Sequence, residues 1–242
     1  MSSSFVERFA SKLESIAEVE VGGEILARFD RYYRILVDWN ERMNLTAITE
    51  VEAVYWKHFF DSAMLLTVPQ FNRQTSLLDV GAGAGFPSVP VHILCPELRV
   101  TVLDSLQKRI SFLKELAGEL QLANFSAFHG RAEDFGQDPK WRESYDQVTA
   151  RALARLPILL ELCLPFVKVG GYFFAMKGPD GEAEASESEK ALQILGGKIE
   201  DILKFDLKEI EGTRTVVVVR KVSPTPETYP RKAGTPSKKP LL

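Results

Sequence analysis

The chain has 242 residues, of which 45% are hydrophobic and 26% are charged, and its formal net charge is −3. This composition predicts one substantial core with room for a small additional domain. We find neither the roughly 20-residue apolar run of a membrane span nor the basic and apolar start of a secretory signal. The two cysteines, Cys95 and Cys163, predict buried free thiols. We therefore expect a cytoplasmic protein with no membrane partner.

The first 67 residues are predicted to be mostly helical. Apolar side chains recur at helical spacing from residue 5 to residue 16, and Glu24–Met43 places its apolar residues on one broad face. A third helix is expected over Val51–Leu66, with Thr49 as its N-cap. The predicted divisions are a helical cap over residues 1–67, a sheet domain over residues 68–222 and a basic tail over residues 223–242.

Residues Leu77–Pro87 read LLDVGAGAGFP and are the most informative stretch of the chain. A short apolar strand reaches Asp79, and glycines then alternate with alanines before a helix that is expected to begin near Phe86. Glycine lets the backbone turn sharply and approach a ligand closely, and the helix start directs N–H groups toward that ligand. The next strand, Arg99–Leu103, ends on Asp104, whose carboxylate is placed to bind two ribose hydroxyls. These features predict a pocket for a nucleoside cofactor.

The glycine spacing favours one class of cofactor. A dinucleotide fingerprint reads G-x-G-x-x-G, whereas here the glycines fall as G-x-G-x-G and Asp79 lies two residues before the first. This D-x-G-x-G-x-G pattern resembles motif I of the Rossmann-like S-adenosylmethionine methyltransferases. An acid beside the turn suits the ammonium group of a methionine moiety better than it suits a phosphate. A nicotinamide or flavin site and a glycine-rich connection with no ligand are the alternatives.

After the glycine turn, strands and helices alternate, which predicts a parallel sheet with helices on both faces. The acidic segment Glu182–Leu195 is expected to be one long surface helix, and Gly170-Gly171 is expected to turn into a strand. Two closing antiparallel strands, joined by Glu211-Gly212, are typical of methyltransferase sheets. The remaining predicted strands are Phe125–His129, Tyr145–Ala150, Tyr172–Met176, Ile202–Leu207 and Thr213–Lys221, and the remaining predicted helices are Lys108–Leu120 and Pro157–Leu164.

Charge is distributed unevenly along the chain. Residues 220–242 contain six basic residues and one acid, a net charge of +5 that leaves −8 on residues 1–219. A basic segment on an acidic body indicates a partner of opposite charge, such as nucleic acid. A solvated, disordered tail is the alternative.

Further motifs extend over almost the whole chain. They are Trp39-Asn40, Asn44-Leu45-Thr46, His58-Phe-Phe-Asp61-Ser62, Asp79–Pro87, Asp104-Ser105 with Lys108-Arg109, Arg131-Ala132-Glu133, Ala150-Arg151-Ala152, Lys177-Gly178 and Tyr229–Pro236. In these motifs the chain resembles the RsmG (GidB) family of 16S ribosomal RNA guanine-N7 methyltransferases. The tail combined with the His58/Asp61 segment is far more selective than motif I, which indicates only the superfamily. Ser88, where many members carry glycine, is a departure of little expected consequence.

The resemblance implies an α/β fold, the Rossmann-like class I S-adenosylmethionine-dependent methyltransferase fold. We expect a mostly parallel seven-stranded sheet with an antiparallel last strand and an N-terminal helical cap. The cofactor would be S-adenosylmethionine. Its methionine and ribose side would be lined by three residues of the glycine turn, Gly81, Gly83 and Phe86.

Four other residues would complete the cofactor site by this resemblance. Asp79 would orient the loop, and Asp104 would accept hydrogen bonds from both ribose hydroxyls. Ala132 and Glu133 would hold the adenine edge, partly through backbone groups. The alternative for Glu133 is an acid at the start of a helix that interacts with the helix dipole.

Arg151 is expected where the fourth strand ends, at the ligand-binding edge of the sheet. Many amino-methylating enzymes carry an Asp/Asn-Pro-Pro-aromatic motif there, whereas this chain has Arg151-Ala152-Leu153-Ala154. N7 of guanine has an in-plane lone pair and no hydrogen, so it can attack a sulfonium methyl group without a general base. Arg151 is then the predicted catalytic residue, and it would orient cofactor or base through its planar guanidinium. A purely structural salt bridge is its alternative.

Five basic residues are expected to contact RNA, mainly through phosphate groups. Lys108 and Arg109 could instead be a solvated helix start, and Lys177 could extend to solvent without an RNA contact. His58 and Asp61 lie one helical turn apart and are expected to form a hinge between cap and sheet, with RNA contact as the alternative; a metal ligand set is not evident. The predicted RNA-binding residues are Lys108, Arg109, Lys177, Arg231 and Lys232.

The resemblance implies methyl transfer from S-adenosylmethionine to guanine-527, at N7, in the decoding-region loop of 16S rRNA. The target should lie in an accessible loop or be unstacked, because folded RNA hides its base edges. The expected partner is 16S rRNA or the small ribosomal subunit. A monomer is expected because the acidic Glu182–Glu189 segment offers no apolar seam. The alternatives are a methyltransferase for a small molecule or protein, and a binding module with a vestigial site.

Overall fold

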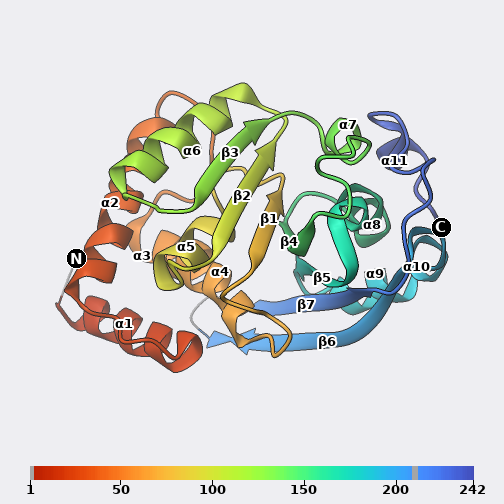
Figure 1. Cartoon of the computed structure of the whole chain (residues 1–242). Coiled ribbons are helices and arrows are strands. Elements are labelled where there is room, and N and C mark those ends of the chain that lie inside the picture. The colour runs from red at the N-terminus through yellow and green to blue at the C-terminus, as the bar shows by residue number, and fades with distance from the viewer. Residues whose placement is uncertain (1–2, 209–211) are drawn as a thin grey trace.

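The computed structural model describes residues 3–208 and 212–242. Within these residues, seven strands form one sheet in the order β3-β2-β1-β4-β5-β7-β6 (Figure 1). Neighbouring strands pair in parallel, except that β7 is antiparallel to both β5 and β6. This is the predicted fold. The strands are β1 (Ser76–Val80), β2 (Arg99–Asp104), β3 (Phe125–His129), β4 (Tyr145–Arg151), β5 (Val167–Lys177), β6 (Gly197–Leu207) and β7 (Gly212–Lys221).

Helices cover both faces of the sheet (Figure 1). One layer holds α1 (Ser3–Ala17), α2 (Gly23–Asn40), α3 (Val51–Val54), a π-helical turn (Tyr55–Phe60), α4 (Asp61–Ala63), a 3₁₀ turn (Met64–Thr67), α5 (Ser88–Leu94) and α6 (Gln107–Glu119). The other holds α7 (Ala132–Phe135), α8 (Leu156–Cys163), a 3₁₀ turn (Leu164–Phe166), α9 (Gly181–Ser186), α10 (Glu189–Leu195) and α11 (Thr235–Lys238).

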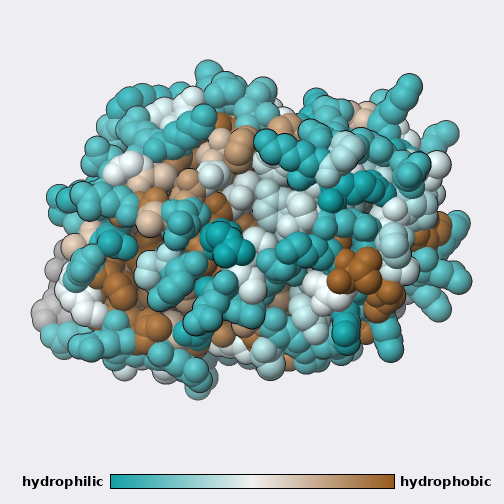
Figure 2. Space-filling view, viewed as in Figure 1, coloured by the Kyte–Doolittle hydropathy of each residue, from teal (hydrophilic) through white to brown (hydrophobic). Residues whose placement is uncertain are grey.

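The strands contribute side chains to two hydrophobic cores because successive side chains point to opposite faces of the sheet. In β1, Leu77 belongs to the core under the N-terminal helices and Leu78 to the core under α8. In β7, Val216 and Val218 face the first core, and the alternate valines face the second. The face of the molecule in Figure 2 is mostly hydrophilic, with smaller hydrophobic patches between the polar groups.

The predicted helical cap shares its core with the sheet. Phe9 and Phe29, from α1 and α2, are fully buried in the same cluster as Leu77 of β1. The predicted third helix forms, but it contains the π-helical turn over Tyr55–Phe60. Its N-cap is Glu50 instead of Thr49, because the Glu50 carboxylate accepts the N–H groups of two residues in the first turn.

Some predicted boundaries were wrong for local physical reasons. The segment Glu182–Leu195 forms two helices, α9 and α10, with a break at Ser188, whose hydroxyl donates to the carbonyl of Glu184 at 2.7 Å. Gly170-Gly171 lies inside β5 as an irregularity instead of a turn before it, and Gly170 has a φ of +92°. The predicted connection at Glu211-Gly212 includes Glu211, which lies outside the described residues.

Three further features concern the cysteines, the apolar segments and the tail. Both cysteines are free and buried, as predicted. Among the described residues, no helix is long and apolar enough to cross a membrane. The tail packs on the body, with Pro236 and Leu241 buried, so the described tail is not the solvated, disordered segment that was its alternative interpretation.

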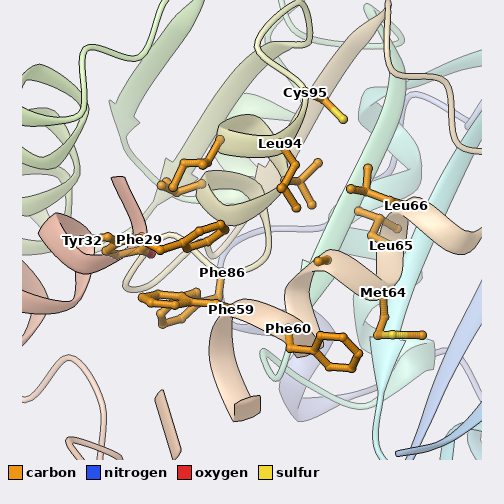
Figure 3. Packing of buried hydrophobic residues seen from close by; sticks show 14 of the residues in the cluster. Phe29, Tyr32, Phe59, Phe60, Met64, Leu65, Leu66, Phe86, Leu94 and Cys95 are labelled. Atoms are coloured by element: carbon orange, nitrogen blue, oxygen red, sulfur yellow. The ribbon is translucent and has the colours of Figure 1, made fainter. Parts of the chain in front are cut away.

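Tyr32 ties the N-terminal helices to the glycine turn. Its side chain is fully buried, and its hydroxyl donates to the carbonyl of Ala84 at 2.5 Å. Its ring stacks on that of Phe86 with centroids 5.6 Å apart, and the ring of Phe59 lies beside both (Figure 3). The glycine turn is therefore supported from below by a residue of α2.

The variant Tyr32→Phe should lower the free energy of unfolding by about 1–3 kcal/mol, because it leaves the buried Ala84 carbonyl without its donor. Tyr33→Phe is the matched control, since the Tyr33 hydroxyl donates to the carbonyl of Thr49 in a more exposed position. Urea denaturation of both variants measures the difference. Equal losses of stability would show that the Tyr32–Ala84 hydrogen bond does not support the turn.

Candidate active site

The glycine turn has a backbone that explains its sequence. Gly81, Gly83 and Gly85 have φ values of +73°, +59° and +91°, in the left-handed region that favours glycine. A side chain at Gly85 would also come within 3 Å of Val89 and of the Tyr32 hydroxyl. The alternating spacing therefore follows from the shape of the turn.

Asp104 fastens this turn to the end of β2. Its carboxylate accepts the N–H of Gly83 at 3.0 Å and the N–H of Leu106 at 2.9 Å. Arg109, predicted to contact RNA, lies 3.3 Å from the same carboxylate. The structure thus brings the predicted turn and the predicted acid together, and it adds Arg109 to them.

The N–H groups of the turn are used differently from the prediction. The helix expected near Phe86 begins at Ser88, as α5. Gly81 N–H donates to the carbonyl of Leu103 at 2.7 Å, and Ser88 N–H donates to Asp79 at 3.3 Å. These donors hold the turn on the protein instead of pointing at a ligand, so the idea that they point unpaired at a ligand was wrong for these positions.

Asp79 is fully buried beneath the turn. Its Oδ1 atom has no hydrogen-bond partner within the described part of the chain, although Oδ2 accepts from Ser88. Burial raises the pKa of Asp79 to about 7. A buried carboxylate with an unpartnered oxygen fits a cationic or hydrogen-bond-donating group of a ligand.

A small cavity of about 90 Å³ lies beside the turn and brings together Gly81, Ala132 and Glu133. Its other lining residues include Ser105 and Leu153. The side chain of Leu153 packs so closely on Gly81 that a Cβ atom there would lie 2.8 Å from it. Ligand pockets for small molecules usually have volumes of about 300 Å³ or more. This cavity is smaller than that, and Leu153 covers the turn at Gly81.

A larger cavity of about 400 Å³ opens next to it, at the ends of β4, β5 and β7. Sequence reasoning identified four of its lining residues as candidates, Arg151, Lys177, His58 and Asp61, but missed others. Its lining comprises Ile48, Lys57, His58, Asp61, Met64, Arg151, Ala152, Met176, Lys177, Gly178, Asp180, Glu184, Arg214, Thr215 and Val216.

Asp61 is the centre of the charge network in this larger cavity. Its Oδ2 accepts from Arg151 Nη1 at 2.7 Å, and its Oδ1 accepts from Arg214 Nε at 2.8 Å. The Asp61 side chain is only 6% exposed. The Arg151 guanidinium lies over the ring of Phe86, 4.9 Å from its centroid. The salt bridge considered for Arg151 does form, and it orients Arg151 at the edge of the cavity.

His58 lies against the same group. Its ring stacks on Phe86 at 4.5 Å, and its Nε2 is 2.8 Å from the hydroxyl of Thr46. Burial and the neighbouring charge of Arg151 lower the pKa of His58 to about 3. The imidazole is therefore neutral at physiological pH and packs between the helical segment and the glycine turn.

The other predicted RNA-binding residues differ in their surroundings. Lys108 and Lys232 are exposed. Lys177 donates to the carbonyl of Ala154 at 2.7 Å and pairs with Glu184 at 2.8 Å. Arg231 pairs with the fully buried Glu161, so its guanidinium serves the protein interior, and we leave it out of the RNA contacts proposed below.

Sequence reasoning missed Arg214, Glu184 and Leu153 as site residues. Arg214 lies on β7, far along the chain from Asp61, and only the antiparallel position of β7 beside β5 brings it to the cavity. The strand Thr213–Lys221 was predicted from the sequence, but its residues carry no signal for the partner of Arg214.

The strand order, the antiparallel β7 and the glycine turn with its acid define a class I S-adenosylmethionine-dependent methyltransferase fold. The chain is similar to a solved S-adenosylmethionine-dependent methyltransferase from Aquifex aeolicus, with a TM-score of 0.51 and 17% identity, covering 70% of this chain and 93% of that one. It is also similar to the fibrillarin pre-rRNA processing protein of Methanococcus jannaschii, with a TM-score of 0.50 and 19% identity, covering 64% and 70%.

Sequence relatives give the family. The family model described as GidB, rRNA small subunit methyltransferase G, matches residues 25–214. Ribosomal RNA small subunit methyltransferase G of Geobacillus thermodenitrificans is 52% identical over 92% of this chain and 94% of its own. The protein of that name from Staphylococcus aureus is 54% identical over 89% and 90%. The chain belongs to the rRNA small subunit methyltransferase G (GidB) family, and the predicted resemblance is confirmed.

S-adenosylmethionine is therefore the cofactor, as predicted, and the turn fits it. A side chain at Gly83 would meet only the carbonyl of Gly81, at 3.9 Å, among the described residues, which leaves room for a close ligand. The unpartnered oxygen of Asp79 suits an ammonium group, and Asp104 stands at the tip of the adjacent strand. The methyl group on the cofactor sulfonium supplies the electrophile, and the chain supplies binding and orientation.

The variant Asp79→Asn should change the pH dependence of stability. The ordinary pKa of this carboxyl is 3.8 and its folded value is about 7, so the folded wild type holds a proton that the unfolded chain releases. The contribution of Asp79 to the free energy of unfolding is therefore greatest below about pH 4, and it is lost as the pH rises from about 4 through 7. The stability of the variant relative to wild type should therefore rise by up to about 4 kcal/mol over this interval.

Urea denaturation of both proteins at several pH values between 4 and 8 gives this difference directly. Taking the difference between variant and wild type removes the contributions of the other titrating groups, His58 included. Parallel curves for the two proteins would show that Asp79 titrates normally.

Proposed function

We propose that this protein transfers the methyl group of S-adenosylmethionine to N7 of guanine-527 in the decoding-region loop of 16S rRNA. The observation that carries the proposal is the larger cavity beside the glycine turn, whose wall at the end of β4 is Arg151-Ala152. An Asp/Asn-Pro-Pro-aromatic motif for exocyclic amines is replaced there by Arg151–Ala154. The family name of its close relatives supports ribosomal RNA of the small subunit as the substrate class.

The surroundings of the cavity suit a nucleophile that carries no proton. N7 of guanine attacks through an in-plane lone pair, so positioning and exclusion of water can supply the catalysis. His58 is neutral and stacked on Phe86, a packing role that requires no proton transfer. We assign no general base.

Arg151 is the residue that we propose to orient the base. Its Nη1 is engaged by Asp61, and its Nη2 lies 3.4 Å from Nδ1 of His58. We propose that the second hydrogen of Nη2 donates to the guanine O6. Arginine often contacts O6 and N7 of guanine together, but N7 must keep its lone pair for methyl transfer. A guanidinium fixed by Asp61 favours contact with O6 alone. Arg214 would hold Asp61 in place from the opposite side.

For the cofactor we propose the roles given by the sequence. Gly81, Gly83 and Phe86 line its methionine and ribose side, and Ala132 and Glu133 hold its adenine edge. Asp104 accepts from the ribose hydroxyls, and these hydroxyls exchange with some of its present donors. Lys108 and Lys232, which are exposed, are proposed to add contacts to RNA phosphate. Lys177 lines the larger cavity and is proposed to contact RNA there, where a phosphate would replace Glu184 as its partner.

The proposed partner is 16S rRNA, free or in the small ribosomal subunit, and the proposed location is the cytoplasm. We propose a monomer. One observation favours a second candidate, a methyltransferase for a small molecule or a protein. Arg231 forms an ion pair with Glu161 of the same chain, so one of the basic residues of the tail does not support a nucleic-acid partner.

The direct test reads 7-methylguanosine in ribosomal RNA of cells with and without the gene. The modification at guanine-527 should be lost without the gene and restored by a plasmid copy. Purified protein with S-adenosylmethionine should also restore it on ribosomal RNA from the deleted strain. Retention of the modification in the deleted strain would overturn the proposed substrate and favour the second candidate.

The variant Arg151→Ala should lower methyl transfer at saturating cofactor by about 100-fold, because the base loses its orienting group. Arg155→Ala is the matched control in the same segment, since Arg155 pairs with Glu187 on the exposed surface. Single-turnover transfer of labelled methyl measures both variants, and thermal unfolding checks that each is folded. Wild-type turnover in a folded Arg151→Ala protein would remove Arg151 from the proposed site.

A further inference from the structure

We propose that the C-terminal tail is a positioning element of the cofactor pocket and acts through a hydrogen bond from Gly234 to Glu133. The backbone N–H of Gly234 donates to Glu133 Oε1 at 2.9 Å. The two residues are separated by 101 positions along the chain. The inference rests on the proposed role of Glu133 beside the adenine.

The tail is built from internal contacts that hold it on the body. Arg231 donates from Nε to Glu161 Oε1 at 2.8 Å and from Nη2 to Oε2 at 2.5 Å, a two-pronged pair. The backbone N–H of Arg231 donates to the same carboxylate at 2.9 Å. Glu161 is fully buried on α8. Loss of Arg231 would leave a buried charge without its partner, so this pair fixes the position of the tail.

A second group of contacts fixes the tail just before Arg231. The guanidinium of Arg142 donates to the carbonyls of Thr225, Pro226 and Tyr229, and also to that of Gly136. The Gln137 amide donates to the carbonyl of Pro230 at 2.8 Å. Pro230 packs so closely on the end of α7 that a side chain at Gly136 would lie 2.9 Å from its ring.

The contacts of Arg231 and of Arg142 together place Gly234 beside Glu133. Gly234 has a φ of +79°, and a Cβ atom there would meet nothing within 4 Å in the described part of the chain. Glycine is therefore required at position 234 by the backbone conformation and not by crowding. That conformation aims its N–H at the carboxylate.

Glu133 lies between the tail and the cofactor site. It lines the small cavity with Gly81 and Ala132, and it also lines a cavity of about 430 Å³ against Pro230, Arg231 and Lys232. A donor on Oε1 restricts the rotation of the carboxylate and leaves Oε2 as the acceptor for the cofactor. The tail thereby sets the direction in which Glu133 can accept a hydrogen bond.

The test compares two glycine variants. Gly234→Ala strains the left-handed backbone and should shift the N–H away from Glu133, so that the dissociation constant of S-adenosylmethionine rises about threefold to tenfold by calorimetry. Gly170→Ala is the matched control. Gly170 has a φ of +92°, nothing within 4 Å of its Cβ position among the described residues, and a location in β5 away from Glu133. It should lower stability in the same way and leave cofactor affinity unchanged.

Kinetics and a double variant separate positioning from general destabilisation. The KM for S-adenosylmethionine should rise in Gly234→Ala, whereas kcat and the KM for RNA should not change. Glu133→Ala, which removes the acceptor, should also weaken cofactor binding, and adding Gly234→Ala to it should weaken binding no further, because the tail acts through Glu133.

Two results would overturn the inference. They are wild-type cofactor affinity in a folded Gly234→Ala protein, and independent, multiplying losses of affinity in the double variant. Both are binding measurements, so they stand apart from the proposed function. If the wild type binds the cofactor but methylates no ribosomal RNA, the proposed substrate fails while the tail effect is still measured.

Discussion

The larger cavity depends on one buried carboxylate between two guanidinium groups. Asp61 is the first residue after the π-helical turn, Arg151 is the last residue of β4, and Arg214 lies on β7. Because the two arginines take different oxygens of Asp61, one side chain sets the relative positions of three elements. Removing either partner of a buried ion pair leaves a charge that costs several kcal/mol. The two ion pairs of Asp61 therefore hold the elements that line the cavity in fixed positions.

The sequence predicted those features that follow from local periodicity and backbone shape. The strand Phe125–His129 agrees with its predicted bounds, and the glycine turn and Asp104 meet as expected. Gly81, Gly83 and Gly85 need positive φ values, which only a few residue types tolerate. Such constraints are visible in one sequence because the residue type itself carries them.

The parts that could not be predicted depend on contacts between distant residues. Nothing in the neighbourhood of Arg214 or Arg231 indicates that the first would pair with Asp61 and the second with buried Glu161. The net charge of the basic tail predicted a nucleic-acid partner, but charge alone does not indicate whether a guanidinium faces solvent or a buried carboxylate. The π-helical turn over Tyr55–Phe60 likewise has no signal in the helical spacing of its residues, four of which are buried.

The segment after β4 joins the two cavities. Arg151 and Ala152 line the larger one, and Leu153 lines the smaller one over Gly81. Ala152 has a φ of +52°, a conformation that costs free energy for a residue with a Cβ atom. Lys177 holds the far end of the segment through the Ala154 carbonyl. Because only Ala152 separates Leu153 from Arg151, a movement of Leu153 away from Gly81 would also shift Arg151, the residue that we propose to orient the base.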